Sequence, residues 1–314
     1  MPKFLRNAIA ALLALTMAFA LSGCAAEQTP NDGRIRVVSA TPVWASVAAQ
    51  LGGPLVVAQP LLSGAGHDPH SYEATARDQL KVNKAQLLIV NGGGYDTFLS
   101  ALAKRAPANS NRLAIDVAES AAAGNQAGSA TGNEHFWYSL DMVGAIAKKI
   151  AQSLTKIDPA HAGLFATNLT AFDADLNSLA SELEALAATN GGKRILATEP
   201  LADYLTANAG LIDATPSAFK AAIEGETDAP LLVVKAMREQ LAAGRVAALV
   251  LNAQTASTQV STLVAAAKVG NVPVVEFNEF QLDSTQTYIN WMSENIRQLA
   301  AALAGLDPKV GGND

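Results

Sequence analysis

Hydrophobic positions along the chain alternate between short apolar runs and longer helical patterns. Residues 35–40 predict a strand, and residues 43–51 predict a helix that stops at a glycine pair. Similar apolar runs predict further strands at 55–58, 87–90, 113–116, 195–198, 247–251 and 272–277. Strands separated by helical segments are typical of βαβ units. We therefore expect an α/β fold of mostly parallel sheets flanked by helices.

The most regular pattern lies in the middle of the chain. Its apolar residues follow one another at spacings of four and three: Phe165, Leu169, Phe172, Leu176, Leu179, Leu183 and Leu186. This spacing places them on one helical face, and the helix, of about 30 residues, is roughly 45 Å long. A coiled-coil dimer would also produce such a stripe, but the flanking positions lack complementary charges. A backbone helix that runs along two lobes fits better.

The N-terminal segment has the layout of a secretory signal. Lys3 and Arg6 precede the uncharged apolar run 8–21, which is too short for a comfortable membrane span. The run ends in Leu-Ser-Gly-Cys, which resembles a bacterial lipobox with Cys24 as the lipidated residue. An ordinary signal peptide with a chance cysteine is the alternative. We expect an extracytoplasmic protein, lipid-anchored to the cell membrane.

These patterns predict a division of the chain into five segments. They are a lipoprotein signal peptide at 1–23, a lipidated tether at 24–33, an N-terminal α/β lobe at 34–157, a long linking helix at 158–190 and a C-terminal α/β lobe at 191–314. The Ala/Gly/Ser-rich stretch 121–131 lacks a hydrophobic pattern and predicts a mobile surface loop.

Charge and cysteine content exclude several classes of function. Removal of the leader takes away Lys3 and Arg6, so 22 basic residues become 20 against 28 acidic ones, a net charge of −8. An acidic balance argues against nucleic acid and against a polybasic membrane patch. Cys24 is the only cysteine, so the mature protein has neither an intramolecular disulfide nor a cysteine cluster for a metal.

Histidine is the residue type that points to a binding site. Two of the four histidines, His67 and His70, lie in the connection after the second predicted strand. His135 follows the 121–131 stretch, and His161 lies near the start of the long helix, where a solvated face residue is the plainer interpretation. Connections at the carboxyl ends of strands bind ligands in α/β folds, and neutral imidazole is a common ligand of transition metals. A loop histidine alone, however, is more often a surface residue.

Several ordered motifs resemble the zinc/manganese solute-binding receptors of ABC importers, the ZnuA/TroA-like family. The resemblance covers about residues 34–303 and rests on the order of its motifs as much as on each one. They are Gly66-x-Asp68-Pro69-His70-x-Tyr72-Glu73, Glu134-His135-x-Trp137, Asp158-Pro159 at the start of the long helix, and the segment from Ala197 to Leu205. It implies a two-lobed metal receptor joined by one long helix.

The resemblance also implies a set of ligands. His70 and His135 take the positions of the first-lobe ligands, and Glu199 takes that of the third. Without the resemblance, Glu199 could equally stabilise the first turn of a helix starting at Pro200. Asp283 takes the fourth position if Glu279 aligns with the family's glutamate. A local shift would either make Glu279 the ligand or leave Asp283 as a hydrogen-bond acceptor beside the ligands.

The expected cargo is a divalent metal, Mn²⁺ or Zn²⁺. Two imidazoles and two carboxylates suit Mn²⁺ or Fe²⁺, because manganese favours oxygen donors. The family's zinc receptors commonly have a third histidine where Glu199 stands here and a His/Asp-rich loop, both of which this chain lacks. Even so, the Irving–Williams order predicts that zinc binds the site at least as tightly in vitro. The implied partner is a cognate ABC permease, and we expect a monomer.

Two other classes of protein are compatible with a surface metal site. A zinc-dependent hydrolase could use the same ligands with an open coordination position and Glu134 or Glu279 as the base. The sequence contains neither His-Glu-x-x-His nor a nucleophile elbow, which disfavours it. A metal-binding adhesin is compatible with surface display but has no sequence feature of its own.

Overall fold

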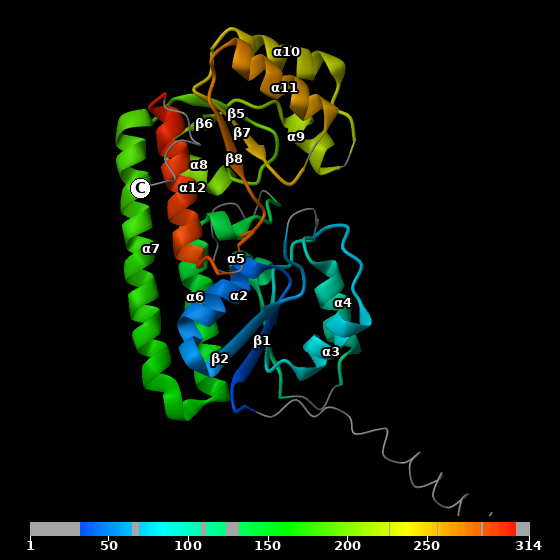
Figure 1. Ribbon diagram of the computed structural model, residues 1–314, viewed down its shortest axis with the longest axis vertical. Helices are drawn as coiled ribbons and strands as arrows, with labels where there is room; N and C mark the ends of the chain where they lie inside the picture. The colour runs from blue at the N-terminus through cyan, green and yellow to red at the C-terminus, as the bar shows by residue number, and fades with distance from the viewer. Residues whose placement is uncertain are drawn as a thin grey trace, which may run out of the picture. The chain divides into compact units, whose positions relative to one another are not determined.

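Two four-stranded parallel sheets with the same strand pattern organise the chain in the computed structural model (Figure 1). The structure describes residues 32–64, 69–107, 111–123, 132–225, 227–255, 257–283 and 285–305. Contacts divide the chain at Arg34 into two units, and every element named below belongs to the second, Ile35–Asp314. The expected α/β class with two mostly parallel sheets is confirmed.

The N-terminal lobe is built on the sheet β2-β1-β3-β4. Its strands are β1 (Ile35–Ser39), β2 (Val56–Pro60), β3 (Leu87–Val90) and β4 (Leu113–Asp116). Its helices are α2 (Pro42–Gly52), α3 (Ala76–Lys84), α4 (Thr97–Arg105), α5 (Val117–Ala123) and α6 (Leu140–Ile157), with short 3-10 turns at Gly53–Leu55 and Phe136–Tyr138. All four residues of β3 are buried, as expected of a central strand covered on both faces.

The C-terminal lobe repeats this arrangement with the sheet β6-β5-β7-β8. Its strands are β5 (Arg194–Ala197), β6 (Ile212–Asp213), β7 (Ala248–Asn252) and β8 (Val274–Phe277). Its helices are α8 (Asp203–Asn208), α9 (Ser217–Glu224), α10 (Leu231–Ala242), α11 (Thr258–Val269) and α12 (Tyr288–Leu303). The fully buried strand β7 lies between β5 and β8, so the ends of these three strands are neighbours.

The long central helix connects the two lobes. A 3-10 turn at Pro159–His161 leads into α7 (Ala162–Asn190), whose 29 residues span about 44 Å. The helix packs on α2 and α6 of the N-terminal lobe and on α8 and α12 of the C-terminal lobe (Figure 1). Five of its seven stripe residues are buried, and Leu169 and Leu186 pack partly buried against the same core. The apolar stripe of α7 therefore packs against the two lobes of the same chain, and a coiled-coil dimer is not needed to bury it.

The structure differs from the sequence-based expectation in small elements. The two-residue strand β6 was not expected, because a run this short has no periodicity to detect. Helix α5 extends through Ala123 into the stretch predicted as a loop, and the rest of that stretch, 124–131, lies outside the described residues. Within the described residues, the structure contains no helix with the length and apolarity needed to cross a bilayer.

Candidate metal centre

Two of the carboxylates singled out by the sequence, Glu199 and Glu279, lie just beyond strands of the C-terminal sheet. Glu199 follows the end of β5 by two residues, and Glu279 follows the end of β8 by two residues. Asn252 is the last residue of β7, the strand between them. The carboxyl ends of parallel strands meet at one edge of a sheet, where α/β folds bind ligands. The three side chains therefore converge because of the topology.

Glu199 and Glu279 form a buried pair held by one amide. They are 9% and 6% exposed. The Asn252 Nδ2 donates to Glu199 Oε2 at 2.9 Å and to Glu279 Oε1 at 2.8 Å. The Thr255 hydroxyl donates to the other oxygen of Glu199. Burial raises the pKa of Glu199 above its ordinary value, although the hydrogen bonds from Thr255 and Asn252 oppose the shift.

His135 supplies an imidazole from the N-terminal lobe, immediately before the 3-10 turn Phe136–Tyr138. Its Nε2 lies 3.5 Å from Glu279 Oε2, so the pair joins the two lobes. Its Nδ1 lies 2.8 Å from Asn133 Oδ1, an amide oxygen that can only accept a hydrogen bond. Nδ1 is therefore the protonated nitrogen of the neutral ring, and Nε2 carries the lone pair that a metal needs.

Asn133 also ties His135 to the segment that carries Glu199. The Asn133 Nδ2 donates to the carbonyl of Pro200 at 2.9 Å, and the Tyr204 hydroxyl donates to the Asn133 carbonyl at 2.7 Å. A histidine ligand held through its second nitrogen keeps its orientation when the metal leaves. The position of His135 is thus set from both lobes.

The buried charges of His135 and Glu279 stabilise each other. Burial by itself lowers the pKa of His135, but Glu279, together with Glu134 and Glu199, more than offsets this and raises the pKa above its ordinary value. Burial by itself raises the pKa of Glu279, and His135, followed by His70 and the Tyr95 hydroxyl, brings it below its ordinary value. A proton held on His135 must be displaced before Nε2 can bind a cation.

His70 approaches the same place from the connection after β2 and is more exposed. Its side chain is 41% exposed, and its Nε2 lies 3.3 Å from Glu134 Oε1. The ring meets Tyr95 edge-on with 5.2 Å between centroids, and the Tyr95 hydroxyl donates to Glu279 Oε2 at 3.3 Å. Tyr95 therefore contacts both His70 and Glu279.

The position of Tyr95 depends on the glycines that follow β3. Gly92, Gly93 and Gly94 have φ of 72°, 68° and 108°, which favour glycine over any side chain. A Cβ at Gly92 would come within 2.5 Å of Asp116 Oδ1. The three glycines thus allow a tight turn that packs against Asp116 directly after β3 and places Tyr95 beside the candidate site.

The separation of His135 and Glu279 is compatible with a shared cation. Metal–ligand bonds of about 2.1 Å at angles of 90–110° separate two ligand atoms by roughly 3.0–3.4 Å. The His135–Glu279 distance of 3.5 Å is close to this range. In the described part of the chain, no three His, Cys, Asp or Glu side chains already form a closed metal-binding group. Of the two histidines near this place, His70 has the more exposed side chain.

Asp283 lies apart from this cluster. It is exposed, and its Oδ1 accepts hydrogen bonds from the backbone N–H and the hydroxyl of Thr285 at 2.8 and 2.7 Å. These bonds lower its pKa and close a local turn. Glu279, the alternative left open by the sequence, is the acidic residue of this segment that lies beside His135, with 3.5 Å between Oε2 and Nε2.

The remaining candidates lie elsewhere. His161 is half-exposed and pairs with Asp158 at 2.7 Å at the start of the long helix, which fits the plainer interpretation. His67 and Cys24 lie outside the described residues. Sequence reasoning missed Tyr95, Asn133 and Asn252, because they are not common metal ligands. The position of Asn252 at the end of a buried strand was the one available signal.

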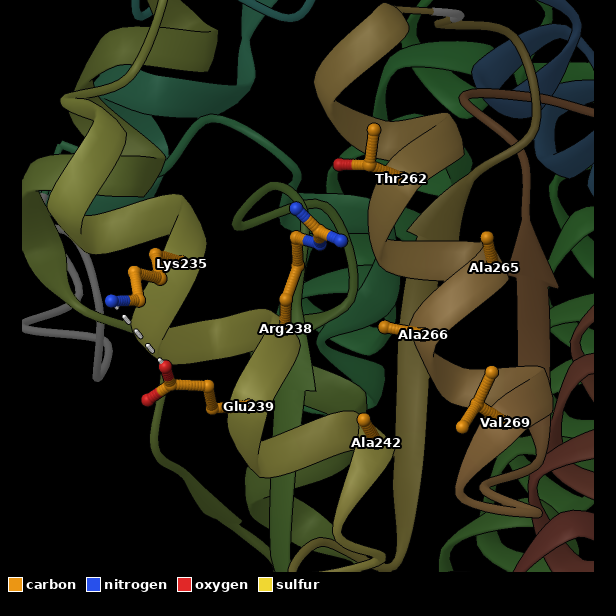
Figure 2. A pocket seen from close by; sticks show the side chains of 8 residues that line it. All are labelled: Lys235, Arg238, Glu239, Ala242, Thr262, Ala265, Ala266 and Val269. Atoms are coloured by element: carbon orange, nitrogen blue, oxygen red, sulfur yellow. Dashed lines mark ion pairs between the residues drawn. The ribbon is translucent and has the colours of Figure 1, made fainter.

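A separate hollow of about 630 Å³ opens between α10 and α11 (Figure 2). Its polar lining includes Lys235, Arg238 and Glu239, and Lys235 pairs with Glu239 at 3.8 Å. The rest is mostly small and apolar, and no histidine lines it. Two cations and one paired carboxylate do not suit a divalent metal, so this hollow is not a second candidate metal centre.

Curated relatives resemble the chain over most of its length. A manganese ABC transporter substrate-binding lipoprotein of Streptococcus gordonii is 24% identical, covering 93% of this chain and 98% of the relative. An iron ABC transporter substrate-binding lipoprotein of Streptococcus pyogenes serotype M1 is 23% identical, covering 91% and 95%. The manganese-binding lipoprotein MntA of Bacillus subtilis is 27% identical over about half of each chain.

Solved structures share the fold. The periplasmic zinc-binding protein TroA from Treponema pallidum superimposes with a TM-score of 0.71 at 19% identity, covering 88% of this chain and 100% of TroA. FpvC from Pseudomonas aeruginosa, in complex with Mn²⁺, gives a TM-score of 0.67 at 21% identity, covering 86% and 98%. The family described as zinc-uptake complex component A, periplasmic, matches residues 37–302. The chain therefore belongs to the ZnuA family, the metal-binding substrate-binding proteins of ABC transporters.

Proposed function

We propose that the chain captures one divalent transition metal between its lobes, with His70, His135, Glu199 and Glu279 as ligands. The observation that carries this proposal is the 3.5 Å approach of His135 Nε2 to Glu279 Oε2 across the lobes. Glu199 joins the same group through Asn252. The set offers two imidazoles and two carboxylates in a largely buried place, which suits a partly dehydrated cation.

The choice of Glu279 over Asp283 is part of the proposal. Glu279 is 6% exposed and bonded to Tyr95 and Asn252, whereas Asp283 is exposed and bonded to its own turn. A metal ligand gains from being held in place before the metal arrives. Of the two carboxylates, Glu279 meets this condition.

Manganese is the cargo that the ligand set favours, with zinc as the alternative. Carboxylate oxygens suit Mn²⁺, and the Streptococcus gordonii and Bacillus subtilis relatives are named for manganese. The Treponema pallidum structure is titled as a zinc-binding protein, and the Streptococcus pyogenes relative is named for iron. We expect Zn²⁺ to bind at least as tightly in vitro, so that metal supply decides which cation is carried.

Delivery of metal to an importer requires a permease partner and requires the protein to be located outside the cytoplasm. Family membership implies an ABC permease as partner. We propose that Cys24 anchors the protein to the membrane as a lipoprotein, that residues 24–33 form the tether, and that the lobes span 34–157 and 191–314 around the linking helix 158–190. A monomer that releases metal to its permease fits this arrangement. The family consists of transport binding proteins, and neither hydrolysis nor adhesion finds support in the relatives.

Elemental analysis tests the proposed function. Purified protein dialysed against Mn²⁺ or Zn²⁺ should retain about one equivalent of metal, and His135→Ala and Glu199→Ala variants should lose it. His161→Ala, which changes an exposed histidine outside the group, is the matched control and should keep full occupancy. Full occupancy in both ligand variants would refute the proposed site.

A further inference from the structure

The amide of Asn252 has a fixed orientation between the two carboxylates. Its side chain is buried, with the residue 1% exposed. Its Oδ1 accepts the backbone N–H of Gln254 at 3.0 Å, so its Nδ2 faces Glu199 and Glu279. An amide nitrogen has two hydrogens, and here each of them goes to a different carboxylate. The donor capacity of Asn252 is therefore used completely by this pair.

These bonds decide which oxygen of Glu279 faces the histidine. Asn252 holds Oε1, whereas Oε2 lies 3.5 Å from His135 Nε2 and accepts from the Tyr95 hydroxyl. On Glu199, Asn252 holds Oε2 and Thr255 holds Oε1. A neutral amide keeps two like charges close together without cancelling the negative charge that attracts a cation, which a lysine at this place would do.

We infer that Asn252 is a positioning residue that fixes the separation and rotation of the Glu199 and Glu279 carboxylates, and so sets how many oxygen atoms they present to the metal. The inference rests on the proposed function. Because the amide turns Oε2 of Glu279, and not Oε1, toward His135 Nε2, Glu279 binds through Oε2. Without the amide, the carboxylates separate and rotate, and the bound metal acquires a different coordination number.

Two substitutions test this role. Asn252→Leu keeps the number of side-chain heavy atoms and their branching with a somewhat larger volume, and Asn252→Ala removes most of the side chain; both remove the amide. Agreement between them assigns an effect to the lost hydrogen bonds rather than to packing, and the smaller side chain avoids a clash if the larger one disturbs folding. Asn168→Ala is the matched control, because Asn168 also donates one amide bond, to the Leu51 carbonyl at 2.9 Å, but from α7.

The measurements are Mn²⁺ affinity and the visible absorption spectrum of bound Co²⁺, whose intensity depends on coordination number. With purified full-length protein we expect both Asn252 variants to bind Mn²⁺ about tenfold to a hundredfold more weakly, as loss of a group that orients a ligand typically costs. Their Co²⁺ spectra should also differ from that of the parent. Asn168→Ala should match the parent in both.

A purely structural role would lower the melting temperature of the metal-free protein and leave the Co²⁺ spectrum unchanged, which would overturn the inference. Parental affinity and spectrum in both Asn252 variants would also overturn it. A His135→Ala variant measured in parallel separates this from failure of the proposed function. If His135→Ala loses metal while the Asn252 variants match the parent, the inferred role of Asn252 is wrong and the proposed site stands. If His135→Ala binds metal as the parent does, the proposed site is wrong.

Discussion

The two lobes share a strand pattern but contribute opposite chemistry to the candidate site. The C-terminal lobe supplies Glu199 and Glu279, both buried and both held by hydrogen bonds. The N-terminal lobe supplies the imidazoles, of which His135 is buried and His70 is 41% exposed in its side chain. The same sheet topology thus supports a rigid carboxylate half and a histidine half with one adjustable member. We expect the carboxylate half to set selectivity and His70 to adapt on capture.

The largest effect should come from the carboxylate half. Glu279→Ala removes a proposed ligand and leaves His135 without its buried partner, so metal affinity should fall about a hundredfold or more. Isothermal titration with Mn²⁺ measures it. Asp283→Ala is the matched control from the same segment and should keep parental affinity. The reverse result, with loss only in Asp283→Ala, would restore Asp283 as the fourth ligand.

A smaller loss should follow from removal of the exposed histidine. His70→Ala should weaken Mn²⁺ binding by about tenfold to a hundredfold, less than His135→Ala in the same assay, because solvent can replace a ligand at an accessible position. Equal losses in the two variants would show that His70 is as firmly placed as His135 once metal is bound, and the contrast between the histidines would not hold.

The affinity for metal should depend on pH through the histidine half of the site, because a proton on His135 competes with the metal. The pKa of His135 is raised, so its proton competes with metal at and somewhat above the ordinary value of about 6.5, and affinity should rise with pH through this window. Below the pKa of His135, each pH unit should lower affinity about tenfold for this one proton. Calorimetry at pH 6.5 in buffers of different ionisation enthalpy should reveal proton release. Heats independent of the buffer would contradict the assignment.

The smallest expected effect concerns the lobes themselves. Helix α7 packs on helices of both lobes, and one hydrophobic core extends from β1 to β5. Opening the site widely would break this core. Small-angle scattering of metal-free and metal-loaded protein should therefore give the same radius of gyration within error. A wide change in domain angle would mean that capture proceeds by hinge motion rather than by side-chain movement.

Much of the fold could be predicted from the sequence because its signals are local. The strands 87–90 and 113–116 have the predicted bounds, and the long helix follows from a regular apolar stripe. Strand β6 could not be predicted, since its two exposed residues carry no periodic pattern; they are recognised as a strand through their pairing with β5.

The site could be predicted less completely. His135 and Glu199 stand in motifs, but the choice between Glu279 and Asp283 depends on how the chain turns after β8, which spacing alone does not decide. Asn252 was missed because an amide is a weak metal ligand. Its role becomes visible only when strand order places β7 between β5 and β8.

The most direct test is the anomalous scattering of a crystal soaked with Mn²⁺. We expect one strong peak within about 2.0–2.3 Å of His70 Nε2, His135 Nε2 and carboxylate oxygens of Glu199 and Glu279. A peak bound by Asp283, or one that lacks contacts to the carboxylates of the C-terminal lobe, would contradict it.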